Sequence, residues 1–137
     1  MGPRRPSAVR YTLAVYIVCF GIAVLTHALD FVQRGWLPYR LGPLALRVFW
    51  NALIGLDAAI VALLLMGRIR SGLVLALTVI AFDVAANAYG MLGLRLPGFE
   101  VPLLFQTTVL GFVLGTIAFV WPGNAAAEPK QAHSDQA

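Results

Sequence analysis

Long apolar runs separated by short polar connections dominate this chain. Four runs, at about residues 10–32, 45–66, 71–92 and 101–121, each approach the roughly 20 residues that an α-helix needs to span a bilayer. Apolar and polar positions do not alternate with a period of two, which argues against a membrane β-barrel. The pattern predicts an all-α protein, an integral membrane antiparallel four-helix bundle.

Glycine, proline and arginine mark the connections between these runs. Residues 34–43 and 93–100 form the two longer connections, and residues 67–70 form a tight turn. Residues 1–123 are expected to make one four-helix transmembrane domain, followed by a disordered polar tail at 124–137. An alternative reads the first run as a signal peptide, but its length and its polar residues favour a membrane helix.

Composition supports the membrane assignment and excludes other classes. Hydrophobic residues make up 60% of the chain and charged residues 12%, against roughly a quarter charged in soluble proteins. Cys19 is the only cysteine, which excludes an internal disulfide and a multi-cysteine metal site. The fingerprints of serine hydrolases, zinc proteases, P-loop proteins and dinucleotide-binding proteins do not occur, and we expect neither a cofactor nor a resident metal.

The distribution of lysine and arginine predicts the orientation. Six basic residues fall on the side of the termini and four on the other side, so both termini are expected to be cytoplasmic, in the inner membrane of a bacterial-type cell. The formal charge of +4 comes mainly from arginines at helix ends, which suits lipid headgroups rather than nucleic acid. The two groups are Arg4, Arg5, Arg10, Arg68, Arg70 and Lys130, against Arg34, Arg40, Arg47 and Arg95.

Two aspartates, Asp57 and Asp83, lie within apolar runs, where an ionisable side chain is costly and usually functional. If the tight turn is centred near Ile69, residues whose numbers sum to about 138 lie level, and the two carboxylates differ by only ~3 Å in depth. No lysine or arginine lies nearby in either run. At least one aspartate is therefore expected to hold a proton at neutral pH while the site is empty. The alternative is a structural hydrogen bond between helices.

Further polar side chains gather toward the same end of the four runs, which predicts an outward-facing polar pocket. His27 and Asp30 can share a proton or supply two ligands to a metal, although an ordinary hydrogen bond is the simpler interpretation. The side-chain amides of Asn51, Asn87 and Gln106 can line this pocket or can form hydrogen bonds that join helices. Most aromatic residues, Tyr39 among them, are assigned to interfacial belts. The predicted lining is Asp83, Asp57, Asn87, Asn51, His27, Asp30, Gln106 and Trp50.

Small residues indicate which helix faces pack closely. The third run carries one small and polar stripe, expected to be buried. On the second run, Asp57 lies about 120° from Asn51 of the small face and shares a face with Trp50 instead. The fourth run offers a small face that is a candidate homodimer seam. The stripes are Gly72, Ala76, Val79, Asp83, Asn87 and Gly90; Asn51, Gly55, Ala58 or Ala59, and Ala62; and Thr107, Gly111 and Gly115.

Size and helix count are similar to those of several small membrane families. The small multidrug-resistance transporters carry a glutamate within their first helix, and the quinone-linked disulfide-forming proteins need cysteine pairs; this chain has neither. Its buried acids resemble, in architecture and without a shared motif, those of the emopamil-binding and sigma-2-receptor group. That resemblance implies a cationic, sterol-like ligand.

Three functions are compatible with these residues. The leading hypothesis is binding or carriage of a proton, a small cation or an amphipathic cationic ligand, with Asp83 as the main charge and Asp57 as its partner. The first alternative is a non-catalytic accessory subunit of a membrane complex, in which the polar cluster fixes helix register. The second is an intramembrane acid/base enzyme acting on a lipid-like substrate through Asp83 and His27, although catalysis is less favoured.

Overall fold

The computed structural model describes residues 6–123, of which 81% are helical. The helices are α1 (Ser7–Arg34), α2 (Leu44–Leu65), α3 (Ile69–Ala88), which continues as the π-helical turn η1 (Tyr89–Gly93), and α4 (Glu100–Val120). No strand occurs in this part of the chain, and the all-helical prediction is confirmed. Each helix is long and apolar enough to cross a membrane, which suggests a multi-pass membrane protein. The predicted tail and the basic residues Arg4, Arg5 and Lys130 lie outside the described residues.

Proline and glycine account for several helix ends. Pro6 and Pro43 stand immediately before α1 and α2, where a missing N–H costs nothing because the first helical donors have no intrahelical partner. Gly35 (φ 80°) follows α1 and Gly67 (φ 75°) lies in the turn between α2 and α3. Both have a positive φ, which glycine adopts without the steric penalty that a Cβ brings.

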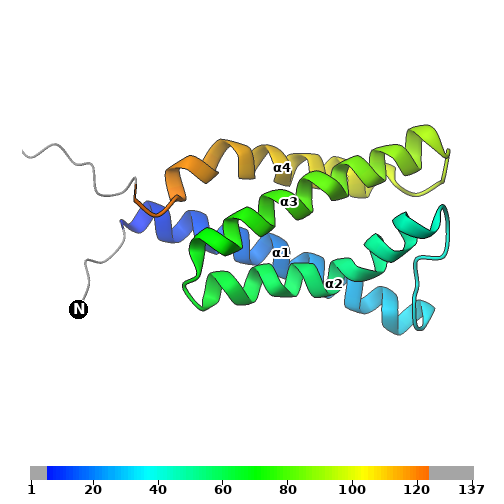
Figure 1. Ribbon diagram of the computed structural model, residues 1–137, viewed down its shortest axis with the longest axis horizontal. Helices are drawn as coiled ribbons and strands as arrows, with labels where there is room; N and C mark the ends of the chain where they lie inside the picture. Colours follow the sequence, from blue (N-terminus) through cyan, green and yellow to red (C-terminus); the bar gives the residue numbers. More distant parts are fainter. Residues whose placement is uncertain (1–5, 124–137) are drawn as a thin grey trace, which may run out of the picture.

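Successive helices run in opposite directions (Figure 1). α1 packs on α2, α2 on α3 and α3 on α4, and a smaller contact joins α4 to α1. Residues 35–43 and 94–99 lie at the same end, which we call the loop end (Figure 1). α1 and α4 lie together near the start of α1 and separate toward the loop end.

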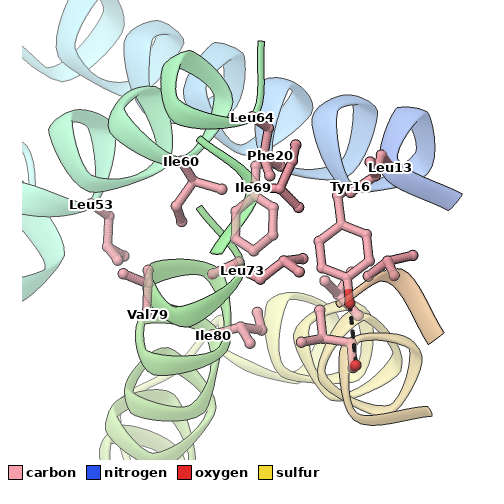
Figure 2. Packing of buried hydrophobic residues seen from close by; sticks show 14 of the residues in the cluster. Leu13, Tyr16, Phe20, Leu53, Ile60, Leu64, Ile69, Leu73, Val79 and Ile80 are labelled. Carbon is pink, nitrogen blue, oxygen red and sulfur yellow. Dashed lines mark hydrogen bonds between the residues drawn. The ribbon is translucent and has the colours of Figure 1, made fainter. Parts of the chain in front are cut away.

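Buried apolar side chains from all four helices pack together in a core (Figure 2). Tyr16 of α1 is 1% exposed, and its hydroxyl donates to the Val113 carbonyl at 3.2 Å or shares a hydrogen bond of 3.0 Å with Thr116 Oγ1. This pair of contacts fastens α1 to α4. Further buried members of this core come from all four helices: Leu13, Phe20, Leu53, Ile60, Leu64, Ile69, Leu73, Ile80 and Val113.

The predicted stripe on α3 is buried throughout, from Gly72 to Gly90. The prediction for α2 is wrong, because Gly55 and Ala62 are exposed. The buried face of α2 is the one that carries Trp50 and Asp57, together with Leu53, Ile60 and Leu64. Large side chains fill the interior on this face, where small ones would leave voids.

The glycines of α4 also face outward. A Cβ added to Gly111 or Gly115 would meet no atom within 4 Å, so the predicted small face is open within the described part of the chain. A homodimer through this face stays a prediction.

At Gly72, α3 lies closely against α2, since an added Cβ would lie 2.6 Å from Leu64 Cδ2 and 3.4 Å from the Leu64 backbone nitrogen. Gly72→Leu is expected to push the helices apart and lower the free energy of unfolding by about 1–3 kcal/mol, or more. Gly55→Leu is the matched control, because nothing lies within 4 Å of that position. Thermal unfolding in detergent compares the two, and equal losses would contradict the close approach.

Candidate functional site

A cavity of about 640 Å³ occupies the loop-end half of the molecule, and all four helices and both loops contribute to its lining. Seven of the eight side chains proposed from the sequence line it together. They are His27, Asp30, Trp50, Asp57, Asp83, Asn87 and Gln106. The stripe on α3 supplies Asp83 and Asn87, and α2, which forms a hairpin with α3, supplies Trp50 and Asp57.

The two buried carboxylates on the cavity wall, those of Asp57 and Asp83, have different surroundings. Asp57 is 3% exposed and Asp83 is 7% exposed. His27 Nε2 of α1 lies 3.6 Å from Asp57 Oδ2. Asp57 therefore has a basic neighbour, which is a histidine from another helix rather than a lysine or arginine of its own run. Asp83 accepts a hydrogen bond of 3.4 Å from Asn87 Nδ2. Within residues 6–123 Asp83 forms no ion pair, which makes it the less compensated acid.

Asn87 organises the wall beside Asp83. Its Oδ1 accepts a hydrogen bond from Trp50 Nε1 at 2.8 Å, and its Nδ2 donates to Gln106 Oε1 at 2.6 Å. The Trp50 ring is buried and lies against Phe99, with 5.1 Å between ring centroids. The amide thus joins α2, α3 and α4, while the aromatic pair walls the cavity.

Tyr39, in the first loop, belongs to the site although the sequence analysis assigned it to an interfacial belt. Its hydroxyl donates to Asp30 Oδ2 at 2.5 Å and lies 2.7 Å from His27 Nδ1. Burial, the hydrogen bond to Asp30 and nearby negative charge raise the pKa of Tyr39 well above its usual value. The hydroxyl therefore keeps its proton for Asp30, and its oxygen accepts a hydrogen bond from His27 Nδ1–H.

These contacts form a path from the surface to the buried acid. Arg34 Nε lies 3.3 Å from Asp30 Oδ1, and Arg34 is largely exposed. The path continues from Asp30 through Tyr39 to His27 and then, across 3.6 Å, to Asp57. Such a chain of donors and acceptors can pass a proton between the loop end and the buried site.

Asn51 holds the first loop instead of lining the cavity. Its Nδ2 donates to the Tyr39 carbonyl at 2.9 Å and to the Arg47 carbonyl at 2.7 Å, and its Oδ1 accepts from the Tyr39 backbone N–H at 3.4 Å. Asn51 therefore positions the backbone of the residue whose side chain joins His27 to Asp30.

Across residues 6–123, no three histidine, cysteine or acidic side chains gather closely enough to hold a metal ion. Neither a family model nor a curated protein nor a solved structure matches this chain. The geometry of the cavity is therefore what points to a function.

Tyr39→Phe is expected to lower the free energy of unfolding by about 1–3 kcal/mol, because it leaves polar atoms of Asp30 and His27 without a partner. Tyr11→Phe is the matched control, since Tyr11 is 74% exposed and its loss should cost little. Thermal unfolding of both variants tests the role of Tyr39. Equal stability of the two variants would show that the hydroxyl contributes nothing.

Proposed function

We propose that this chain binds or carries a cationic organic ligand in its cavity, with Asp83 as the principal anionic group and Asp57 as the second. The observation that carries this proposal is two buried carboxylates on one cavity wall, with His27 as the basic neighbour of only one of them. A carboxylate within a membrane is costly unless it holds a proton or meets a cation. A cationic group that enters the cavity replaces that proton.

The cavity favours an organic cation over a bare metal ion. About 640 Å³ falls within the roughly 300–1,000 Å³ of small-molecule sites. Trp50, Phe99 and Tyr39 line it, and aromatic faces attract organic cations. The donor groups that a metal needs are spread along the wall and do not converge, as the described residues show.

The proposal includes an antiparallel bundle that places the loop end outside the cell and both termini in the cytoplasm. In a Cys19→Ser background, Glu100→Cys at the loop end and Ser71→Cys at the opposite end are both exposed positions. A membrane-impermeant maleimide added to intact cells should label Glu100→Cys and leave Ser71→Cys unlabelled. Labelling of Ser71→Cys without labelling of Glu100→Cys would show that the loop end faces the cytoplasm.

The charge requirement can be tested with a pair of ligands of the same shape. Phenyltrimethylammonium should raise the unfolding temperature of the protein in lipid nanodiscs, whereas neutral tert-butylbenzene should not. The effect of the cation should shrink as the pH is lowered, because protons compete with it for the carboxylates. Equal stabilisation by both molecules would reject a cation site. No stabilisation by either, with co-purification of a larger partner, would favour the accessory-subunit hypothesis.

A further inference from the structure

The cavity opens sideways as well as toward the loop end. Ile22 of α1, and Val101 and Phe105 of α4, line the cavity and are nevertheless 47%, 77% and 51% exposed. A side chain that lines a cavity and is also exposed at the outer surface lies where the cavity opens. At the loop end the same holds for Leu41, which is 58% exposed. We call the opening between α1 and α4 that these residues border the lateral slot.

The divergence of α1 and α4 produces the lateral slot. The contacts that fasten the two helices are at Tyr16, which bonds to Val113 and Thr116 and packs its ring against Phe112. Ile22 lies six residues farther along α1, about 9 Å beyond this contact. The two helices separate toward the loop end (Figure 1).

The depth of the slot matters because its edges lie within helices that are long enough to cross a membrane. Ile22 is twelve residues, or about 18 Å, from the loop-end limit of α1, and Phe105 is about 8 Å from the start of α4. The slot therefore extends from the level of the loops into the apolar zone. A molecule with a polar head and an apolar chain can move through it without drawing its head across hydrocarbon.

The two walls of the cavity suit the two halves of such a molecule. The edges of the slot are aliphatic or aromatic, and a hydrocarbon chain can lie there at no cost. Asp57 and Asp83 lie on the buried α2 and α3 side, where they can receive a cationic head.

We propose that the ligand is an amphipathic cation, of the class of single-chain alkylammonium compounds, which enters from the bilayer leaflet beside the loop end through the slot between α1 and α4. Its chain lies between Ile22 and Phe105 while its head lies at Asp83 and Asp57. The proposal rests on the cation site proposed above and adds the ligand class and the route.

The test compares a ligand that has a chain with one that lacks it. Binding of dodecyltrimethylammonium and of phenyltrimethylammonium is measured in nanodiscs, with Asp83→Asn protein as the reference for nonspecific partitioning into lipid. Ile22→Trp narrows the slot, and Val18→Trp is the matched control, one turn away on the exposed surface of α1 and not on the cavity wall. Phe105→Trp narrows the slot from α4 and gives an independent variant.

Ile22→Trp and Phe105→Trp are each expected to weaken dodecyltrimethylammonium binding about tenfold or more. Val18→Trp should leave it within about twofold. Binding of phenyltrimethylammonium should change little in all three variants. A photoreactive group at the end of the dodecyl chain should label segments around Ile22 and Phe105.

The outcomes separate the route from the function. If both cations bind in an Asp83-dependent manner and Ile22→Trp behaves like Val18→Trp, the slot proposal is overturned and the cation site stands. If neither cation binds in an Asp83-dependent manner, the proposed function itself fails. If neutral dodecanol competes as well as the cation, the slot holds an ordinary lipid chain and the assignment of a cationic amphipath is overturned.

Discussion

Asp83→Asn is expected to weaken the binding of phenyltrimethylammonium by about 2 kcal/mol or more, roughly 30-fold in Kd, because removing one partner of a buried charge pair leaves the other charge unpaired. Asp83 is buried, faces the cavity and forms no ion pair within the described residues. Asn87 can still hydrogen-bond to an asparagine at this position, so the variant preserves the shape of the wall while removing the charge.

Asp57→Asn should have a smaller effect on binding than Asp83→Asn, since His27 already lies 3.6 Å from the Asp57 carboxylate. Calorimetric titration of both variants in nanodiscs gives the ranking. Thermal unfolding of the empty proteins is the control. Each variant should be at least as stable as the wild type, because an aspartate here must either be buried with its charge or take up a proton, and a neutral amide avoids both costs. Earlier unfolding of both variants would identify the aspartates as structural hydrogen-bonding groups.

Trp50→Ala is expected to produce the largest loss of stability, about 3–5 kcal/mol in the free energy of unfolding. The Trp50 side chain is 4% exposed, donates to Asn87 and packs against Phe99. An added Cβ at Gly90 would lie 3.5 Å from the ring, which shows how closely α3 approaches it. The substitution leaves a void and an unpaired amide oxygen at the same time.

Two further variants separate these contributions. Trp50→Phe keeps most of the ring but leaves Asn87 Oδ1 without its donor, at a cost of about 1–3 kcal/mol. Trp36→Ala is the control, because Trp36 is 79% exposed, although its ring lies 5.7 Å from that of Phe31. Denaturant unfolding should rank the losses as Trp50→Ala, then Trp50→Phe, then Trp36→Ala. Equal losses for the two alanine variants would contradict the role assigned to Trp50.

The fold class follows from the sequence because apolar runs of membrane-spanning length have few alternatives in a bilayer. The α3 stripe could be predicted as well, since small and polar residues from Gly72 to Gly90 coincide on one face. The face of α2 could not be predicted from the same principle. There the interior needed the bulk of Trp50 and Leu53, and the small residues lie outside.

Residues of the site could be predicted where helix periodicity determines which face a side chain lies on. They could not be predicted where a loop folds back over a helix. Asp83 and Asn87 are one helical turn apart, so their common face can be read from the sequence. Tyr39 reaches His27 and Asp30 only because the first loop returns over α1, and Asn51 secures that return with side-chain bonds to its backbone. Neither spacing nor composition contains that information. The approach of His27 to Asp57 likewise depends on how α1 packs against α2.

Because Tyr39 contacts His27, the position of the first loop is thermodynamically linked to the binding of a ligand at the buried aspartates. The loop holds the imidazole through Nδ1, while Nε2 of the same ring faces Asp57. Any molecule that binds the loop and displaces Tyr39 must alter the surroundings of Asp57. By reciprocity, a cation at Asp57 must then change the affinity of that molecule by the same factor. An antibody fragment raised against residues 36–41 would thus report on ligand binding inside the membrane without touching the ligand.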